Sequence, residues 1–180
     1  MAEIASPRNL CRKRRDVAVS LNDLALVLRD QGKFTEAEAL QREALEVRRK
    51  LYGNEHAEVA ESLNNLALVL RSESRLAEAE KLHRDALAMG LKLFGHDHLA
   101  VATSLNNLAL TLDAEGNPAD AEACFRESLG IQKKLLGDDQ PGLAITLDNL
   151  AFVLREEGRV DEAETVERQS LEMQRKIFGP

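Results

Sequence analysis

The nine residues 59–67, VAESLNNLA, recur along this chain at a fixed spacing. Close variants occupy residues 17–25 (VAVSLNDLA), 101–109 (VATSLNNLA) and 143–151 (LAITLDNLA), so the four copies begin 42 residues apart. A fixed period of this length indicates stacked supersecondary units, because one unit is too small to bury its apolar face alone. The period therefore predicts a repeat array, and it favours a binding surface over a catalytic pocket.

Composition narrows the class of protein further. The 180 residues hold four such periods and little else, and aromatic residues make up only 3% of them. The core must then be built from Leu, Val and Ala, as in helix-on-helix packing. The net charge of −7 argues against a nucleic-acid or membrane partner, and the basic run 12–15 (RKRR) is interpreted as a solvated helix start.

No feature of the sequence indicates a cofactor, a metal or an export signal. Cys11 and Cys124 fit neither a disulfide framework nor a zinc motif. No stretch reaches the roughly 18 apolar residues of a membrane span. The expected localisation is cytoplasmic, and neither a bound cofactor nor enzymatic activity is expected, because no catalytic motif appears.

Each period reads as two helices. Leu63, Leu66 and Leu70 recur at helical spacing, and a second helix follows through Ala79 and Ala86. A glycine ends the second helix in every period, and another breaks three of the four helix pairs. The former are Gly53, Gly95, Gly137 and Gly179; the latter are Gly32, Gly116 and Gly158. Eight helices in four antiparallel pairs are therefore expected.

Two sets of positions are predicted to be buried. One is an apolar stripe on the first helix, made of Val17, Leu21, Leu24 and Leu28. The other is a set of small residues at a constant phase, which would let helix backbones approach closely. Its members are Ala25, Ala37, Ala44, Ala67, Ala79, Ala86, Ala109, Ala121, Ser128, Ala151, Ala163 and Ser170.

These residues resemble a tetratricopeptide repeat. Leu21-x2-Leu24-Ala25-x2-Leu28 is similar to the first-helix pattern of that family, and Ala37 and Ala44 fall where its second-helix small residues belong. The 42-residue length resembles the kinesin light chain repeats, as do residues 63–67 (LNNLA) and 94–98 (FGHDH). The second-helix aromatic of those repeats survives only as Phe125. Gln41, His83 and Glu167 replace it elsewhere.

The resemblance implies an all-α fold, a right-handed α-solenoid of four tetratricopeptide-like helix-turn-helix repeats. The array would cover residues 16–180, divided as 16–54, 55–96, 97–138 and 139–180. Residues 1–15 would be an N-terminal extension that is partly disordered, with residues 11–16 continuing the first helix.

An apolar ladder repeats on the opposite side of the first helix from the core stripe. Its members are Leu26, Leu68, Leu110 and Phe152. In the resembling family the first helices line a concave surface, so the ladder would floor a groove open to water. The alternative is that neighbouring second helices cover it.

Polar residues flank this ladder. Three residues before it stand Asp23, Asn65, Asn107 and Asn149, and asparagines in this phase contact extended peptides in kinesin light chain-like arrays. Their neighbours Asn22, Asn64, Asn106 and Asp148 are expected to tie helices or loops together, and local bonding is an alternative for both sets. Three residues after the ladder stand Arg29, Arg71 and Arg155, with Asp113 interrupting the series. They would attract acidic peptide residues or compensate helix C-termini.

The segment His96-Asp97-His98 is interpreted as a helix-entry loop capped by Asp97, in preference to a metal site. The predicted function is a protein–protein interaction scaffold that binds an extended or short helical peptide in its concave groove. The alternative is a self-associating or regulatory repeat array of a larger enzyme or motor complex. It is suggested by the lack of a capping helix after Gly179, which would allow a homo-oligomer.

Overall fold

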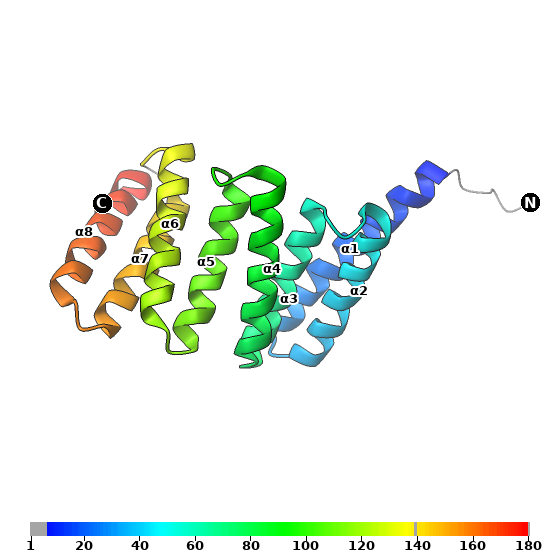
Figure 1. Cartoon of the computed structure of the whole chain (residues 1–180), viewed down its shortest axis with the longest axis horizontal. Coiled ribbons are helices and arrows are strands. Elements are labelled where there is room, and N and C mark those ends of the chain that lie inside the picture. The colour runs from blue at the N-terminus through cyan, green and yellow to red at the C-terminus, as the bar shows by residue number, and fades with distance from the viewer. Residues whose placement is uncertain (1–6, 139, 180) are drawn as a thin grey trace, which may run out of the picture. The chain divides into compact units, whose positions relative to one another are not determined.

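The computed structural model describes residues 7–138 and 140–179, and these residues form eight helices and no strand (Figure 1). The helices are α1 (Pro7–Asp30), α2 (Phe34–Tyr52), α3 (Ala57–Ser72), α4 (Leu76–Phe94), α5 (Leu99–Ala114), α6 (Pro118–Leu136), α7 (Pro141–Glu156) and α8 (Val160–Phe178). The all-α prediction and the expected number of helices are confirmed. The chain divides into two compact units, unit 1 (Met1–Met89) and unit 2 (Gly90–Pro180).

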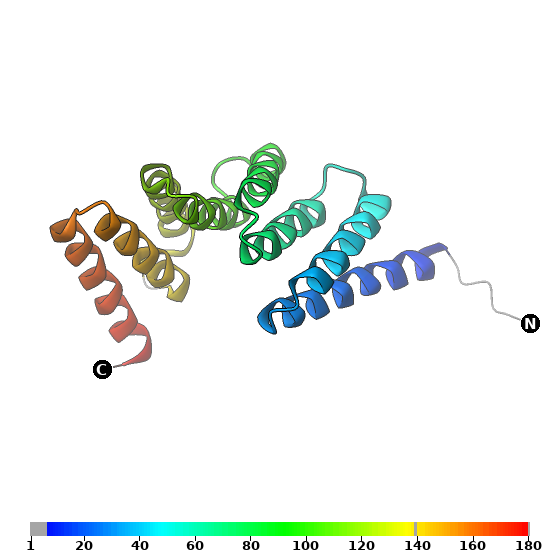
Figure 2. The ribbon, with the colours of Figure 1, turned by 90° about the horizontal axis from the view of Figure 1, so that it is seen from below.

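Helices follow one another as antiparallel pairs joined by short turns (Figure 2). In unit 1, α2 packs on both α1 and α3; in unit 2, α6 packs on α5 and α7, and α7 packs on α8. The first helices of neighbouring pairs also touch, α1 with α3 and α5 with α7. Each unit therefore presents a face made of two adjacent first helices, which we call the first-helix face.

The turn inside each helix pair uses a left-handed residue, as the glycine pattern predicts. Gly32, Gly116 and Gly158 have φ of 76°, 80° and 77°. The second pair lacks the glycine, and Ser74 adopts φ of 61° in its place. The following amide closes the turn in the usual way, for example Arg75 N donating to Leu70 O at 2.9 Å. Ser74 thus holds a conformation that a side chain disfavours.

An arginine clasp follows this turn in two of the four repeats. In unit 1, Arg75 donates to Glu38 on α2 at 2.8 Å and to Glu73 at 2.9 Å, and it pairs with Glu78 at 2.7 Å. In unit 2, Arg159 makes the same set of contacts, with Glu122, Glu157 and Glu162. The equivalent residue of the third repeat is Asn117, so the clasp recurs every second repeat.

The small residues pack as predicted: all twelve are buried. The two serines of the set also bond across their helix pair, with Ser128 Oγ donating to Ala102 O at 2.8 Å and Ser170 Oγ donating to Ala144 O at 3.2 Å. In unit 1 the alanines join two apolar clusters, one centred on Leu45, Val59 and Leu66, the other on Ala25, Ala37 and Val69.

The predicted core stripe is wrong for α1. Leu24 is 50% exposed and Val17 is also about half exposed, whereas the equivalent Leu66 on α3 is 1% exposed. The buried side chains of α1 are Ala18, Asn22 and Ala25 instead. The physical reason is that a preceding second helix covers this stripe on α3 and α7, and none precedes α1 in the described residues.

The N-terminal region is helical further back than the predicted start of the array. Helix α1 begins at Pro7, so the described part of the 1–15 extension is helix, and the expected helical continuation over residues 11–16 is confirmed. Residues 1–6 lie outside the described residues. The basic run 12–15 is exposed on α1. Over the described chain, none of the helices combines the length and the apolar character needed to cross a bilayer.

Candidate functional site

The predicted ladder residues lie on the first helices of both units. Leu26 and Leu68 stand on the adjacent helices α1 and α3, and Leu110 and Phe152 on α5 and α7. The three leucines are half-buried and Phe152 is 44% exposed. All four side chains therefore retain some contact with solvent, and none is shut inside the core.

In unit 1, amide side chains connect the first helices to each other. Asn65 Nδ2 on α3 donates to Asn22 Oδ1 on α1 at 2.7 Å, and Gln41 Nε2 on α2 donates to the same oxygen at 3.1 Å. Asn22 Nδ2 in turn donates to Asp23 Oδ1 at 3.3 Å. Two predicted binding residues, Asp23 and Asn65, are thus drawn into a network that holds helices together.

The second helix supplies the partner of the neighbouring amide in both repeats of unit 1. Gln41 bonds Asn22, and His83 Nδ1 lies 2.9 Å from Asn64 Oδ1, which can only accept. His83 is fully buried, and this burial, together with the positive charge of Arg71, lowers its pKa to about 4. The expectation that Asn22 and Asn64 tie helices together agrees with these bonds.

In unit 2, the same position on the second helix is Phe125, which is fully buried and offers no polar atom. The residue of α5 that corresponds to Asn22 and Asn64 is Asn106. Its buried Oδ1 has no hydrogen-bond partner in the described residues. In the last repeat, Asp148 accepts a bond from Gln174 at 3.1 Å. Asn106 therefore stands apart from its three equivalents, and the sequence analysis missed it, although Phe125 in place of a polar second-helix residue could have indicated it.

Asn106 lines a cavity of about 340 Å³ between α5 and α7. The cavity is bordered by Leu99 and Thr103 on α5 and by Ile145, which is 60% exposed, on α7. The lining also includes Gln132 and Leu136 of α6 and Thr146 of α7, so apolar and polar side chains together surround a cavity that contains one unpaired oxygen. Such an arrangement suits a ligand that carries an N–H donor next to an apolar group. The predicted residues Asn107 and Asn149 lie half-buried on the same two helices.

The arginine series differs in character between the units. In unit 1, Arg29 and Arg71 are close enough that the charge of Arg29, after burial, lowers the pKa of Arg71. In unit 2, burial and the charge of Glu156 raise the pKa of Asp113. Arg155 lies over the Phe152 ring at 5.5 Å and pairs with Glu167 at 3.4 Å. The end of the first-helix face is cationic in unit 1 and mixed in unit 2.

The histidine loop before α5 caps a helix, but the capping residue is not the predicted one. His98 Nδ1 accepts the Ala100 amide at 3.1 Å, and its ring stacks on Phe94 at 4.2 Å. Asp97 instead pairs with Lys134. A stacked imidazole fits this place because Phe94, the last residue of α4, supports the ring. The part of the chain that the structure describes contains no cluster of three or more His, Cys, Asp or Glu side chains suited to a metal.

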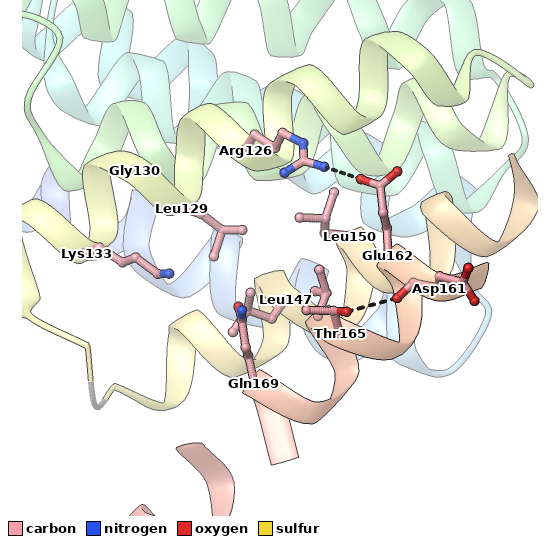
Figure 3. Close-up of a pocket in the computed structure, with 11 residues that line it drawn as sticks. Arg126, Leu129, Gly130, Lys133, Leu147, Leu150, Asp161, Glu162, Thr165 and Gln169 are labelled. Carbon is pink, nitrogen blue, oxygen red and sulfur yellow. Dashed lines mark hydrogen bonds and ion pairs between the residues drawn. The ribbon is translucent and has the colours of Figure 1, made fainter. Parts of the chain in front are cut away.

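A second cavity, of about 630 Å³, opens on the side of unit 2 formed by the second helices (Figure 3). Leu147 and Leu150 on α7 form its floor, and an ion pair of 3.6 Å between Arg126 and Glu162 lies at its edge. Gly130 and Val166 line it where unit 1 has the larger Glu46 and Leu82, which explains the space. None of the residues predicted to bind lines this cavity.

Comparison with known proteins identifies the repeats. A family model described as tetratricopeptide repeat matches residues 16–92, 65–134 and 112–176. No curated protein sequence matches the chain significantly.

Several solved structures share the fold at low sequence identity. BtubC (BKLC) of P. vanneervenii is 24% identical over 91% of this chain, which spans 65% of BtubC, with a TM-score of 0.80. A putative kinesin light chain of P. anserina with nearly identical TPR-like repeats is 24% identical, with coverage of 92% and 77% and a TM-score of 0.80. Aspartyl phosphate phosphatase F of Bacillus subtilis is 13% identical, with coverage of 91% and 42% and a TM-score of 0.79.

Proposed function

Because this chain belongs to the tetratricopeptide repeat family, whose members are generally scaffolds for protein–protein interaction, we propose that it binds a partner protein through a peptide segment on its first-helix face. The peptide would be extended or a short helix. In this proposal the predicted ladder supplies apolar contacts and the flanking polar side chains orient the peptide backbone.

The observation that carries the proposal is the unpaired Asn106 Oδ1 beside the cavity between α5 and α7. A buried acceptor without a partner costs free energy, and a peptide N–H placed on it would remove that cost. Leu99 and Ile145, both exposed, lie on either side and would cover the adjacent peptide side chain. The segment best suited to this place therefore has an apolar residue next to a free backbone amide.

Charge at the end of the face suggests a preference in unit 1. Arg29 and Arg71 are neighbouring cations there, and an acidic peptide residue would relieve their mutual repulsion. Arg29 already bonds Asp30 at 2.9 Å, so Arg71 is the more available of the two. In unit 2, Asp113 and Glu156 would disfavour an acidic residue at the equivalent place.

The test is a selection from a peptide library against the full chain, followed by affinity measurement with a fluorescent copy of the selected peptide. Replacing Ile145 with Asp should weaken binding by more than about tenfold, and replacing Asn106 with Ala by about tenfold, since each removes a contact worth about 1.4 kcal/mol or more. Circular dichroism should show unchanged helix content in both variants.

A matched control distinguishes the two faces of unit 2. Thr165 is exposed on α8 and lines the cavity between α6 and α8. Thr165→Asp introduces the same charge as Ile145→Asp and should leave affinity unchanged. If Thr165→Asp abolishes binding and Ile145→Asp does not, the peptide site lies on the second helices and the proposal is wrong.

A second candidate function, self-association of the array, is favoured by a different observation. Apolar residues are exposed on the outer side of both α1 and α8, among them Leu24 and Leu171. Exposed apolar surface of this kind marks interaction sites. Self-association and peptide binding would use different faces, so they are compatible.

A further inference from the structure

Among the described residues, two apolar faces lack the cover that their equivalents receive elsewhere. On α1 the face consists of Val17, Leu24 and Val27, each about half exposed. On α8 it consists of Val160, Leu171 and Phe178, which are also exposed. One comparison shows the effect of missing cover: Leu171 is 46% exposed, whereas Leu45, which holds the same position on α2, is 6% exposed.

The contact between α2 and α3 shows how such faces close inside the array. Leu45 on α2 packs in one cluster with Val59, Leu63 and Leu66 on α3. The residue three periods after Leu45 is Leu171 on α8. The residues one period before the three α3 residues are, in the same order, Val17, Leu21 and Leu24 on α1. The α8 face therefore carries the leucine that an α1 face would receive.

A second cluster closes the other half of the same contact. Val69 on α3 packs against Ala37, with Phe34 beside it, on α2. The equivalent residues are Val27 on α1 and Ala163 and Val160 on α8. Both halves of the internal apolar contact thus have their counterparts on the two open faces, at matching positions.

Polar contacts between consecutive pairs follow the same register. Between α6 and α7, Gln132 Nε2 donates to Thr146 Oγ1 at 3.2 Å. The equivalent donor on α8 is Gln174, and the equivalent acceptor on α1 is Ser20. In the arginine clasp, Arg159 bonds Glu122 at 2.6 Å. The equivalent cation is Lys33, in the turn after α1, and the equivalent carboxylate is Glu164 on α8. Each donor and each acceptor has a chemically suitable counterpart at the opposite end of the chain.

The aromatic contact and the overall charge agree with this register. Tyr52 stacks on His56 at 4.3 Å and Phe94 stacks on His98 at 4.2 Å, and the equivalent residues are Phe178 and Arg14. An arginine can replace the imidazole on an aromatic ring. From Asn9 onward, helix α1 carries five basic and three acidic side chains, and α8 carries three basic and five acidic ones. The two helices are therefore complementary in charge.

We propose that the α8 face of one copy binds the α1 face of a second copy, in the register of the internal repeats. This inference rests on self-association, the second candidate function, and it specifies the surfaces used. The contact joins two different surfaces, so it is heterologous and copies add head to tail. Leu171 would pack between Val17 and Leu24 of the second copy, and Glu164 would pair with its Lys33.

The experiment measures the mass of the full chain by light scattering across a concentration series. The wild-type chain should exceed its monomer mass of 19.9 kDa as concentration rises. Leu24→Asp and Leu171→Asp should each remain monomeric, because every copy then carries the same damaged face. An equal mixture of the two variants should form a species of twice the monomer mass and nothing larger, since one intact pair of faces remains.

Two further variants make the test specific to the register. Val19→Glu replaces an exposed apolar residue of α1 with the residue that α3 carries at the same position, Glu61, and should assemble as the wild type does. Glu164→Lys should weaken assembly several-fold, and adding Lys33→Glu in the same chain should restore it. Circular dichroism of each variant confirms that it is folded.

The outcomes separate the inference from self-association in general. A wild-type chain that stays at its monomer mass at every concentration overturns both. A wild-type chain that assembles while Leu24→Asp and Leu171→Asp also assemble overturns the pairing of these two faces and leaves self-association through another surface. Two monomeric variants that form no heterodimer on mixing likewise overturn the pairing.

Discussion

Unit 1 and unit 2 are built from the same repeat, yet they treat the amide next to the ladder differently. In unit 1, Asn22 and Asn64 each have a polar partner on the following helix, Gln41 and His83. In unit 2, Phe125 takes the partner position and the Asn106 oxygen is left unpaired beside a cavity. A single residue on the second helix thus decides whether a first-helix amide serves the fold or is available to a ligand.

This exchange also changes what stabilises each unit. A buried imidazole and an amide network contribute to unit 1, whereas a buried aromatic ring contributes to unit 2. Hydrogen bonds of this kind have a small net value because water competes for them, and apolar burial has a larger one. The two units should therefore respond differently to mutation and to pH.

The largest effect is expected at Phe125. Phe125→Ala removes a fully buried ring and should lower the free energy of unfolding by about 3–5 kcal/mol, measured by urea denaturation. Hydrogen exchange should place the loss of protection in α5 and α6. Phe125→Leu, which retains most of the volume, should cost less than about 1.5 kcal/mol. A cost below about 1 kcal/mol for the alanine variant would show that the ring is not what holds unit 2 together.

A somewhat smaller effect is expected from protonation of the buried imidazole of His83 in unit 1. His83 has a pKa of about 4 in the fold and about 6.5 when unfolded, so between these values the unfolded chain binds the extra proton. Stability is full above about pH 6.5 and falls as the pH drops toward 4, by up to about 3 kcal/mol. His83→Gln copies the first repeat, where Gln41 bonds Asn22, and should remove this dependence.

Comparing the wild-type chain with His83→Gln separates the effect of the imidazole on stability from the effect of the carboxylates. Glu38 and Glu122 both have lowered pKa values: burial opposes the shift, and arginines that bond them outweigh it. Glu38 lies in unit 1 and Glu122 in unit 2, and both are unchanged in His83→Gln. Urea denaturation of wild type and His83→Gln at several pH values measures the difference. Parallel pH profiles would mean that His83 has the same pKa in the folded and in the unfolded chain.

The smallest effect is expected at the turn of the second repeat. Ser74 has φ of 61° where the other repeats have glycine, so Ser74→Gly should stabilise the chain by about 1 kcal/mol. Thermal unfolding measures the change. Ser72→Gly, at the end of α3, should act in the opposite direction, by up to about 1 kcal/mol, because glycine disfavours helix. A lower melting temperature for Ser74→Gly would show that the serine side chain itself supports the turn.

Much of the fold could be predicted from the sequence, because repetition multiplies every weak local signal by four. The glycine stops, the buried alanines and the helix pairs all follow from positions such as Gly53 and Ala67 that keep one phase. The exception was α1, where the stripe containing Leu24 is apolar but uncovered. Periodicity shows that a residue is apolar, whereas burial depends on a neighbouring helix.

The candidate site was harder to predict for a related reason. The ladder and the amide series could be placed on the first helices, but their hydrogen bonds depend on residues one helix away. Asn65, predicted to bind a ligand, bonds Asn22, while Oδ1 of Asn106, predicted to be structural, has no hydrogen-bond partner among the described residues. The cap at His98 was missed because an imidazole accepts an amide there only with the support of Phe94.

The arginine clasp has a consequence for how such an array can change in length. Arg75 and Arg159 lie two periods apart, and Asn117 between them makes no equivalent clasp. The acceptor on the preceding second helix is present in every repeat, as Glu38, Glu80, Glu122 and Glu164, so a clasp arginine meets a glutamate whichever repeat precedes it. Deletion of the third period, for example, would place Glu80 where Arg159 now bonds Glu122. Recombination within this gene is therefore expected to be tolerated in steps of one 42-residue period.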